Sequence, residues 1–272
     1  MQRLSHAHVI TRFSRNHPPV LEVEPGDTLV VETLDCWGGL ARDERPPDLA
    51  NPSTGPIAVR SARPGQVLEV DILAITPGPR GFVSAEGVTR YVDLVDGCAV
   101  FAESLRLPLQ PMIGVIGVAP AEGEPPCTHP GDHGGNLDTI DVCPGATICL
   151  PVQVAGALLA LGDVHACQGD GEVSGQGIEV GSEVKLRVRL GEAPLVPRPY
   201  VFREGRLLTI ASGATLEEAA RTSIEDMVSV LATKLEVSRA EARMLVSLSG
   251  HVRISQIVNP LMTARVEMPV LW

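Results

Sequence analysis

Apolar residues recur along the first two thirds of the chain in short runs that Gly, Pro or Asp separates. The runs are rich in Val, Ile and Leu, and this composition and length are typical of β-strands. Three of the runs follow a Pro-Gly pair, which favours a tight turn leading into a half-buried strand. The pattern therefore predicts a mainly β fold with a sandwich or jelly-roll-like body. The expected strands are residues 20–24, 28–34, 67–75, 147–154, 157–161 and 184–190.

The last third of the chain changes to helical spacing. Thr215 and Glu218 have the spacing of a capping box, and apolar residues then follow a 3.6-residue period over 216–235. Ser238 and Glu241 form a second pair of the same kind and open a shorter helix. We therefore predict two helices, one of about five turns and one shorter.

The shorter helix should end at Gly250, and residues 252–258 and 263–272 have the composition of strands. This combination predicts a C-terminal α+β subdomain over 196–272 that completes the fold of a β-rich catalytic body over 1–195. The boundary is placed where three prolines cluster, at positions 194, 197 and 199.

Composition narrows the class of protein. With 272 residues, 44% of them apolar, the chain can bury a large core, but only 3% are aromatic, so the core must be aliphatic. A net charge of −11 argues against a nucleic-acid partner. No apolar run approaches a membrane span and the first residues lack the apolar segment of a signal peptide, so we expect a cytoplasmic protein without a membrane partner. Exposed strand edges favour a homodimer.

Polar chemistry is concentrated in two glycine-containing segments, THPGDHGGNLDTID at 128–141 and LGDVHACQGDGEVSG at 161–175. Asp163 and His165 lie two residues apart, and on a strand such side chains point to the same face. Imidazole and carboxylate groups are the ligands of a catalytic Zn²⁺ or a similar divalent ion. The structural alternative is that each residue forms a turn or lies in solvent. Spacing alone leaves both interpretations open.

Five stretches in order resemble the acetamidase/formamidase family over nearly the whole chain. HGGNLDT at 133–139 and GDVHACQGDGEVSG at 162–175 are similar to the two most specific motifs of that family. The segment between Gly78 and Leu109 matches only loosely, and Gly250-His251 departs from the pattern before RISQ. The other three matching stretches are 24–39, 51–75 and 253–260.

The resemblance implies hydrolysis of the C–N bond of small linear amides, giving ammonia and a carboxylate, with a divalent metal that is zinc or, alternatively, calcium. The hypothesis for the metal ligands is Asp35, His133, Asp163 and His165. Glu172 would move the proton, and Asn136 or the backbone amides of Gly134 and Gly135 would face the oxyanion. Asp138 would orient a ligand histidine. The resemblance also carries over Gln168 as a substrate-side residue and Asp170, which could exchange roles with Asp138 or Glu172.

Other functions stay open at this point. No G-x-S-x-G nucleophile motif occurs, but Cys167 lies two residues after His165 and is an alternative nucleophile. The chain could instead be a metal-stabilised β-protein that binds a small polar ligand without reaction, or a hydrolase of a larger or cyclic amide. None of the six cysteines forms a C-x-x-C pair, so reduced, buried thiols are expected.

Overall fold

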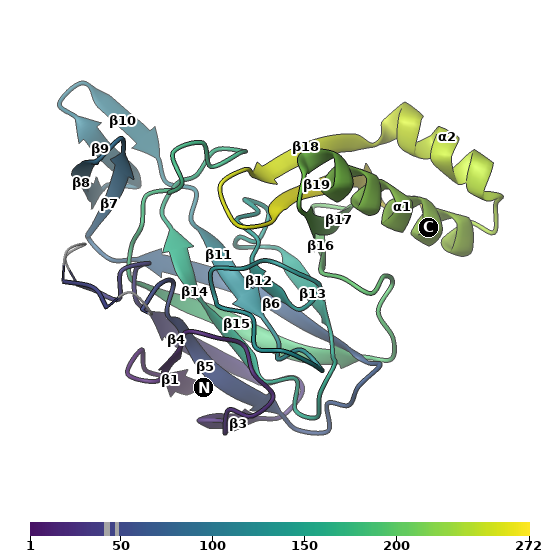
Figure 1. The fold of residues 1–272 in the computed structure, drawn as a ribbon, viewed down its shortest axis with the longest axis horizontal. Helices are drawn as coiled ribbons and strands as arrows, with labels where there is room; N and C mark the ends of the chain where they lie inside the picture. The colour runs from purple at the N-terminus through teal and green to yellow at the C-terminus, as the bar shows by residue number, and fades with distance from the viewer. Residues whose placement is uncertain (41–43, 47–48) are drawn as a thin grey trace.

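The computed structural model describes residues 1–40, 44–46 and 49–272, and it is mainly β with two C-terminal helices. In Figure 1, helices α1 and α2 lie with strands β16–β19 at one end of the molecule, and strands β7–β10 project at another. The fold class predicted from the sequence is therefore confirmed. No helix among the described residues has the length and apolar character that a membrane crossing requires.

A nine-stranded sheet extends through the whole molecule in the order β1-β4-β15-β6-β13-β16-β17-β19-β18. It joins the N-terminal strands to the C-terminal ones through the antiparallel pair β13–β16, so both predicted parts contribute to one sheet. Its strands are Gln2–Leu4 (β1), Thr28–Thr33 (β4), Val67–Pro77 (β6), Thr147–Pro151 (β13), Ser182–Gly191 (β15), Tyr200–Arg203 (β16), Arg206–Gly213 (β17), His251–Gln256 (β18) and Met262–Pro269 (β19).

A six-stranded sheet packs against it, with the order β12-β11-β14-β5-β2 and with β3 parallel to β5. A separate four-stranded sheet has the order β10-β9-β8-β7. The strands of the six-stranded sheet are Val9–Ile10 (β2), Leu21–Val23 (β3), Ser53–Val59 (β5), Met112–Gly117 (β11), Gly134–Asn136 (β12) and Leu159–His165 (β14). Those of the four-stranded sheet are Arg80–Ala85 (β7), Val88–Val95 (β8), Cys98–Ala102 (β9) and Leu105–Pro108 (β10).

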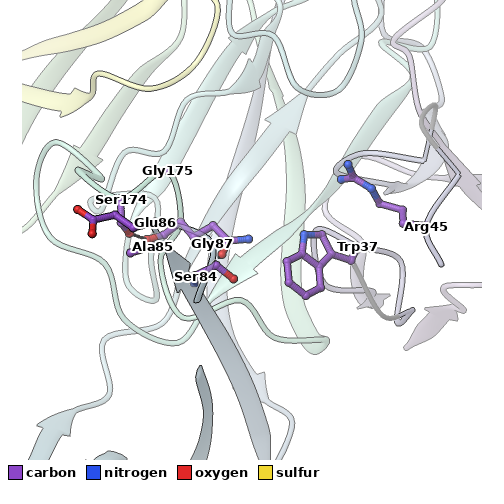
Figure 2. Close-up of a pocket in the computed structure, with 9 residues that line it drawn as sticks. Trp37, Arg45, Ser84, Ala85, Glu86, Gly87, Ser174 and Gly175 are labelled. Carbon is purple, nitrogen blue, oxygen red and sulfur yellow. Dashed lines mark hydrogen bonds between the residues drawn. The ribbon is translucent and has the colours of Figure 1, made fainter. Parts of the chain in front are cut away.

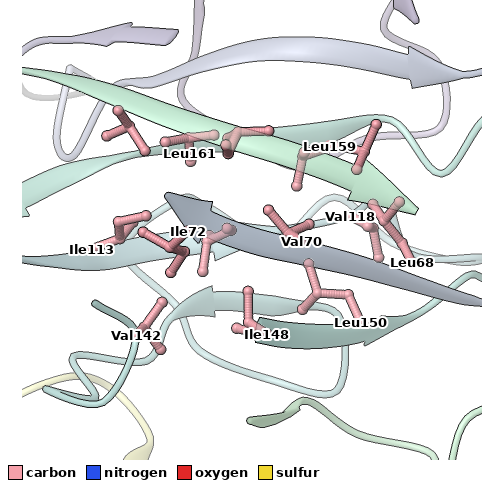
Figure 3. Packing of buried hydrophobic residues seen from close by; sticks show 14 of the residues in the cluster. Leu68, Val70, Ile72, Ile113, Val118, Val142, Ile148, Leu150, Leu159 and Leu161 are labelled. Atoms are coloured by element: carbon pink, nitrogen blue, oxygen red, sulfur yellow. The ribbon is translucent and has the colours of Figure 1, made fainter. Parts of the chain in front are cut away.

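The main core lies between the nine-stranded and six-stranded sheets and is aliphatic, as the scarcity of aromatic residues predicted. Figure 3 shows Val70 and Ile148 of the first sheet in the same layer as Ile113 and Leu161 of the second. Burying one such side chain stabilises the fold by about 1.5–3 kcal/mol. Strand β15 alternates buried and exposed residues, whereas β11 and β14 are buried on both faces. One face of β14 packs in the main core, and the polar side chains of the candidate active site are buried on its other face.

The two helices begin where the sequence predicted. Helix α1 spans Leu216–Lys234, and the Thr215 hydroxyl caps it by accepting a hydrogen bond from the Glu218 amide. The Glu218 carboxylate bonds the Ala214 amide instead of that of Thr215, so the first capping box is incomplete. Helix α2 spans Arg239–Ser249 and has the complete box of Ser238 and Glu241. Both helices pack against β16, β17 and β19 through a second apolar cluster, which secures the end of the nine-stranded sheet.

Candidate active site

Asp163 and His165 of the second glycine-containing segment, 161–175, lie at the end of strand β14. Asp163 Oδ1 lies 3.6 Å from His165 Nε2, and both side chains are almost completely buried. Glu179 joins them from the segment after the motif, because its backbone bridges both Phe82 of β7 and His165 of β14. Its Oε1 lies 3.1 Å from His165 Nε2. Together with Cys36, the carboxylates of Asp163 and Glu179 offer ligand atoms within 4.8 Å of one another.

The hydrogen bonds of His165 indicate which ring nitrogen is available to a ligand. Its Nδ1 lies 2.7 Å from Gln168 Oε1. The amide of Gln168 is oriented by its own nitrogen, which donates to the Asp138 carbonyl at 2.9 Å. Gln168 Oε1 can only accept, so Nδ1 carries the proton and Nε2 of a neutral ring presents its lone pair. That lone pair faces two carboxylates.

Several buried atoms at this point have no hydrogen bond. They are His165 Nε2, Asp163 Oδ1 and Glu179 Oε2. Burial lowers the pKa of His165, but Glu179 and Asp163 oppose it and raise that pKa well above its ordinary value. Burial raises the pKa of Glu179 to about 8. A lone pair and two carboxylates converging in a buried space repel one another unless a proton or another cation lies between them.

A second group of candidate ligands shares His165. It consists of Asp138, His165 and Glu172, again with one atom of each within 4.8 Å. Burial, followed by the neighbouring Asp163 carboxylate, raises the pKa of Asp138 to about 6. Burial and the Asp138 carboxylate raise the pKa of Glu172 to about 10. The Asn259 amide steadies Asp138 by donating to its Oδ2 at 2.7 Å. The two motif segments are thus brought together, with one carboxyl group of each beside His165.

Three residues of the site have left-handed backbone conformations that non-glycine residues rarely adopt. The φ angles are +45° at Asp138, +53° at Asp163 and +45° at Glu172. Such conformations cost about 1–3 kcal/mol each and persist only where the surroundings impose them. They turn three acidic side chains toward one point, which regular strand geometry would not do.

The backbone of β11 forms the floor beneath these carboxylates. A Cβ atom at Gly114 would lie 2.7 Å from Asp138 Oδ1 and 2.7 Å from the Asp163 carbonyl oxygen. Only glycine at this position leaves room for both acidic residues.

We expect Gly114→Ala to destabilise the protein by about 1–3 kcal/mol, because the added methyl group must displace Asp138 or Asp163. Urea unfolding measures the effect. Gly169→Ala is the matched control, since a Cβ atom at Gly169 meets nothing within 4 Å. Equal behaviour of the two variants would contradict the assignment of Gly114 as the floor of the site.

A cavity of about 200 Å³ opens over the cluster. Asp163, Glu172 and Glu179 line its inner part, and Trp37 and Arg45 line it as well. A second cavity of about 260 Å³ shares Trp37 and Arg45 with the first. Figure 2 shows these two side chains opposite the β7–β8 turn at Ser84 to Gly87. The two cavities are therefore neighbours, and they are called the inner cavity, over the cluster, and the outer chamber.

Asn136, predicted to face the oxyanion, lies between the acidic residues. Its amide satisfies its neighbours when its nitrogen lies 3.1 Å from Asp163 Oδ2 and 3.2 Å from Asp138 Oδ2. Asn51 donates to the same Asp163 oxygen at 2.7 Å. The Gly134 amide donates to the Gly131 carbonyl, and a Cβ atom at Gly135 would collide with the backbone of His129. In this arrangement, glycine at both positions allows neighbouring backbone segments to pack closely.

Two of the four predicted metal ligands are absent from both groups. The Asp35 carboxylate accepts hydrogen bonds from the Trp37 and Gly39 amides and so closes a turn. The His133 ring packs edge-on against Phe13 at 5.0 Å, and burial, with His129 nearby, lowers its pKa to about 4. Asp35 and His133 therefore lie outside both groups, although His133 Nε2 is also buried without a hydrogen-bond partner, whereas Asp163 belongs to one group and His165 to the other.

Cys167, the alternative nucleophile, does not share this arrangement. Its thiol donates to the Pro108 carbonyl at 3.2 Å, and burial raises its pKa, which disfavours the thiolate. All six cysteines are free, as the sequence predicted, but only four are buried, because Cys98 and Cys167 are partly exposed.

Sequence reasoning missed several residues of the site. The sequence did contain an indication of Glu179, because a single carboxylate stands there between two apolar residues, Ile178 and Val180, which are both buried in the structure. Asn51 and Asn259 gave no such indication, since an asparagine before a proline is typical of a turn. For Cys36 the sequence leaves two interpretations, a buried neighbour of Asp35 or a soft ligand, and the structure places it beside Asp163 and Glu179.

Comparison with known proteins agrees with these motifs. Residues 2–106 and 117–194 match the sequence model of the Acetamidase/Formamidase family. The acetamidase structure from Bacillus halodurans is 40% identical, with a TM-score of 0.95 over 98% of this chain and 97% of that one. A predicted acetamidase/formamidase from Thermoanaerobacter tengcongensis is also 40% identical, with a TM-score of 0.96 over 98% and 95%.

A formamidase from Methylophilus methylotrophus is 26% identical over 66% of this chain. The match spans 63% of the length of that relative, so this chain covers less than two thirds of it. With the extent of the sequence match and the two close structural relatives, the chain belongs to the acetamidase/formamidase family.

Proposed function

We propose that this protein hydrolyses the C–N bond of small linear amides, such as formamide and acetamide, to ammonia and a carboxylate, and that it uses a divalent ion. The observation that carries the proposal is the placement of His165 Nε2, 3.6 Å from Asp163 Oδ1 and 3.1 Å from Glu179 Oε1, in a buried space where Nε2, Asp163 Oδ1 and Glu179 Oε2 have no hydrogen-bond partner. Family membership supports the reaction class.

The residues present fit such an ion. Imidazole, carboxylate and thiolate are zinc ligands, whereas calcium prefers oxygen atoms alone, so the imidazole favours zinc. Asp163 and Glu179 would hold the ion with His165, whose Nε2 lies beside both, and Cys36 lies in the same group as the two carboxylates. When bound, a divalent cation lowers the pKa of water and polarises a carbonyl group.

The protein residues would supply the remaining chemistry. In amide hydrolysis, the oxygen of water bonds to the carbonyl carbon, the C–N bond breaks, and nitrogen leaves with a proton as ammonia. Glu172 lines the cavity beside Asp138, and its raised pKa keeps a proton on its carboxyl group, so it is placed to give that proton to the departing nitrogen and to recover one from water. Gln168 would keep His165 in one tautomer, and Asn51 and Asn136 would hold the Asp163 carboxylate still.

An inner cavity of about 200 Å³ supports small amides as the substrate class. We expect ammonia release from formamide and acetamide, with kcat/KM falling by at least about tenfold for a bulky amide that loses good placement at the reacting centre. A panel running from formamide to a cyclic amide, scored for ammonia, measures this order. Preference for the larger amides would favour the outer chamber as part of the substrate site. Binding without any ammonia would favour a non-catalytic ligand-binding protein.

The cytoplasmic location and the homodimer expected from the sequence stay predictions. Size-exclusion chromatography with light scattering tests the dimer directly.

A further inference from the structure

One arginine is buried behind the site and has no role in the proposed chemistry. Arg265 lies on β19 and is 1% exposed, the largest fully buried side chain among the described residues. A buried guanidinium requires partners for its whole planar fork. Its Nε lies 2.8 Å from Asp141 Oδ2, and its Nη2 donates to Asp170 Oδ1 at 2.8 Å.

The two acidic partners belong to different motif segments. Asp141 lies three residues after Asp138, and Asp170 lies two residues before Glu172. Arg265 therefore joins the two loops through Asp141 and Asp170. The carboxyl groups of Asp138 and Glu172, on the same two loops, lie close together beside His165.

The neighbouring strand β18 holds the same two loops. Gly171, the residue before Glu172, donates to the Ser255 carbonyl and accepts from the Ile257 amide. The Thr139 hydroxyl, one residue after Asp138, donates to Ser255 Oγ at 2.9 Å. Arg265 Nη1 donates to that same Ser255 hydroxyl and to the Ile254 carbonyl, both at 3.2 Å. The guanidinium thus lies at the centre of a network that includes both loops and β18.

We propose that Arg265 is a positioning residue that sets the distance between the carboxyl groups of Glu172 and Asp138 by pairing with Asp170 and Asp141 at once. The inference rests on the proposed function, in which these two carboxyl groups manage the protons. This positioning role requires the planar guanidinium group of arginine, which can pair with two carboxylates at once, whereas the compact ammonium group of lysine cannot do so in the same geometry.

The surroundings of Arg265 permit a direct test by chemical rescue. Arg265 lines a cavity of about 390 Å³ whose wall includes the partly exposed side chains of Arg206 and Arg253. An Arg265→Ala variant would leave a space in the shape of a guanidinium that small cations can reach through this cavity. We expect kcat to fall by about 100-fold with KM changed less than about threefold, because a displacement of about 1 Å in the catalytic group has a cost of that order. Guanidinium at non-denaturing concentration should restore at least about a tenth of the lost kcat, and tetramethylammonium should not.

Arg253→Met is the matched control, since Arg253 lines the same cavity but pairs with Glu267. It should keep kcat within about threefold of the unmodified protein, as expected for a partly exposed ion pair. If Arg265→Ala does not fold, Arg265→Lys keeps the charge without the fork and should still lose kcat at unchanged KM. Unchanged turnover in both Arg265 variants, or a loss without rescue that Arg253→Met shares, would overturn the proposal.

Hydrogen exchange supplies a readout that does not depend on turnover. The Gly171 and Ile257 amides, which join the Glu172 loop to β18, should exchange at least about tenfold faster in Arg265→Ala and slow again with guanidinium. If the unmodified protein releases no ammonia, the proposed function fails while this measurement still tests the positioning role. Exchange rates equal to those of the unmodified protein would contradict the role even in an active enzyme.

Discussion

Removal of the divalent ion by a chelator should reduce ammonia release by at least about 1,000-fold, and addition of Zn²⁺ should restore it. The reason is the convergence of His165 Nε2, Asp163 Oδ1 and Glu179 Oε2, which have no hydrogen-bond partner among the described residues. The ion should also stabilise the fold, by about 2.7 kcal/mol when its free concentration is 100 times its Kd, because it binds the folded state alone. Elemental analysis, an ammonia assay and thermal unfolding at each step measure the effect.

Calcium and magnesium are the controls for metal identity. An imidazole ligand favours zinc, so neither ion should restore turnover at the concentration at which zinc does. Full activity in protein that elemental analysis finds free of metal would refute the proposed ion. Restoration of turnover by calcium alone would instead identify calcium as the ion, which is the alternative that the family resemblance left open.

Glu172→Gln should lower kcat by about 100- to 10,000-fold while the protein keeps its metal content, since the amide cannot carry a proton between water and nitrogen. Glutamine has the same shape, so the cavity should not collapse. Steady-state kinetics with acetamide and elemental analysis of the same sample measure the two quantities.

Two controls separate proton transfer from other effects of this change. Glu217→Gln, on the exposed face of α1, should leave both kcat and metal content unchanged. Glu179→Gln should lower metal content, because that carboxylate lies 3.1 Å from His165 Nε2. Turnover of Glu172→Gln within about tenfold of the unmodified protein, with metal bound, would rule out Glu172 as the proton shuttle. Loss of metal from Glu172→Gln would identify Glu172 as a ligand instead.

The apolar runs of the sequence predicted both helices and the strands β3, β4, β6, β13, β14, β15, β18 and β19, but they did not predict β5, β11, β16 or β17, which also contribute side chains to the main core. They also did not predict the four-stranded sheet of β7–β10. There β8 is mostly exposed and β10 wholly so, and strands without a buried face have no alternation to detect. Gly250 ends α2 as predicted, although with φ near −90° and not in the left-handed conformation.

The sequence indicated residues of the candidate site that lie close together along the chain, and it missed those that the fold brings from elsewhere. Asp163 and His165 lie two residues apart and are neighbours in the structure, where the left-handed backbone of Asp163 helps to direct its carboxylate. Asn259 and Glu179 reach the site through the pairing of distant segments, which no spacing along the chain can indicate. His133 belongs to a specific motif, yet its ring turns to Phe13, because a motif fixes residue types without fixing side-chain directions.

The position of Trp37 makes it an intrinsic fluorescence probe of the cavities that it lines. The chain has two tryptophans. Trp37 is buried, stacks on Phe82 at 3.9 Å and lines both chambers, whereas Trp272 is 43% exposed at the C-terminus. A soluble quencher should therefore suppress the emission of Trp272 first, and the remaining fluorescence should come from the wall that the two cavities share. Binding of a small molecule in either cavity could then be followed in real time without a label.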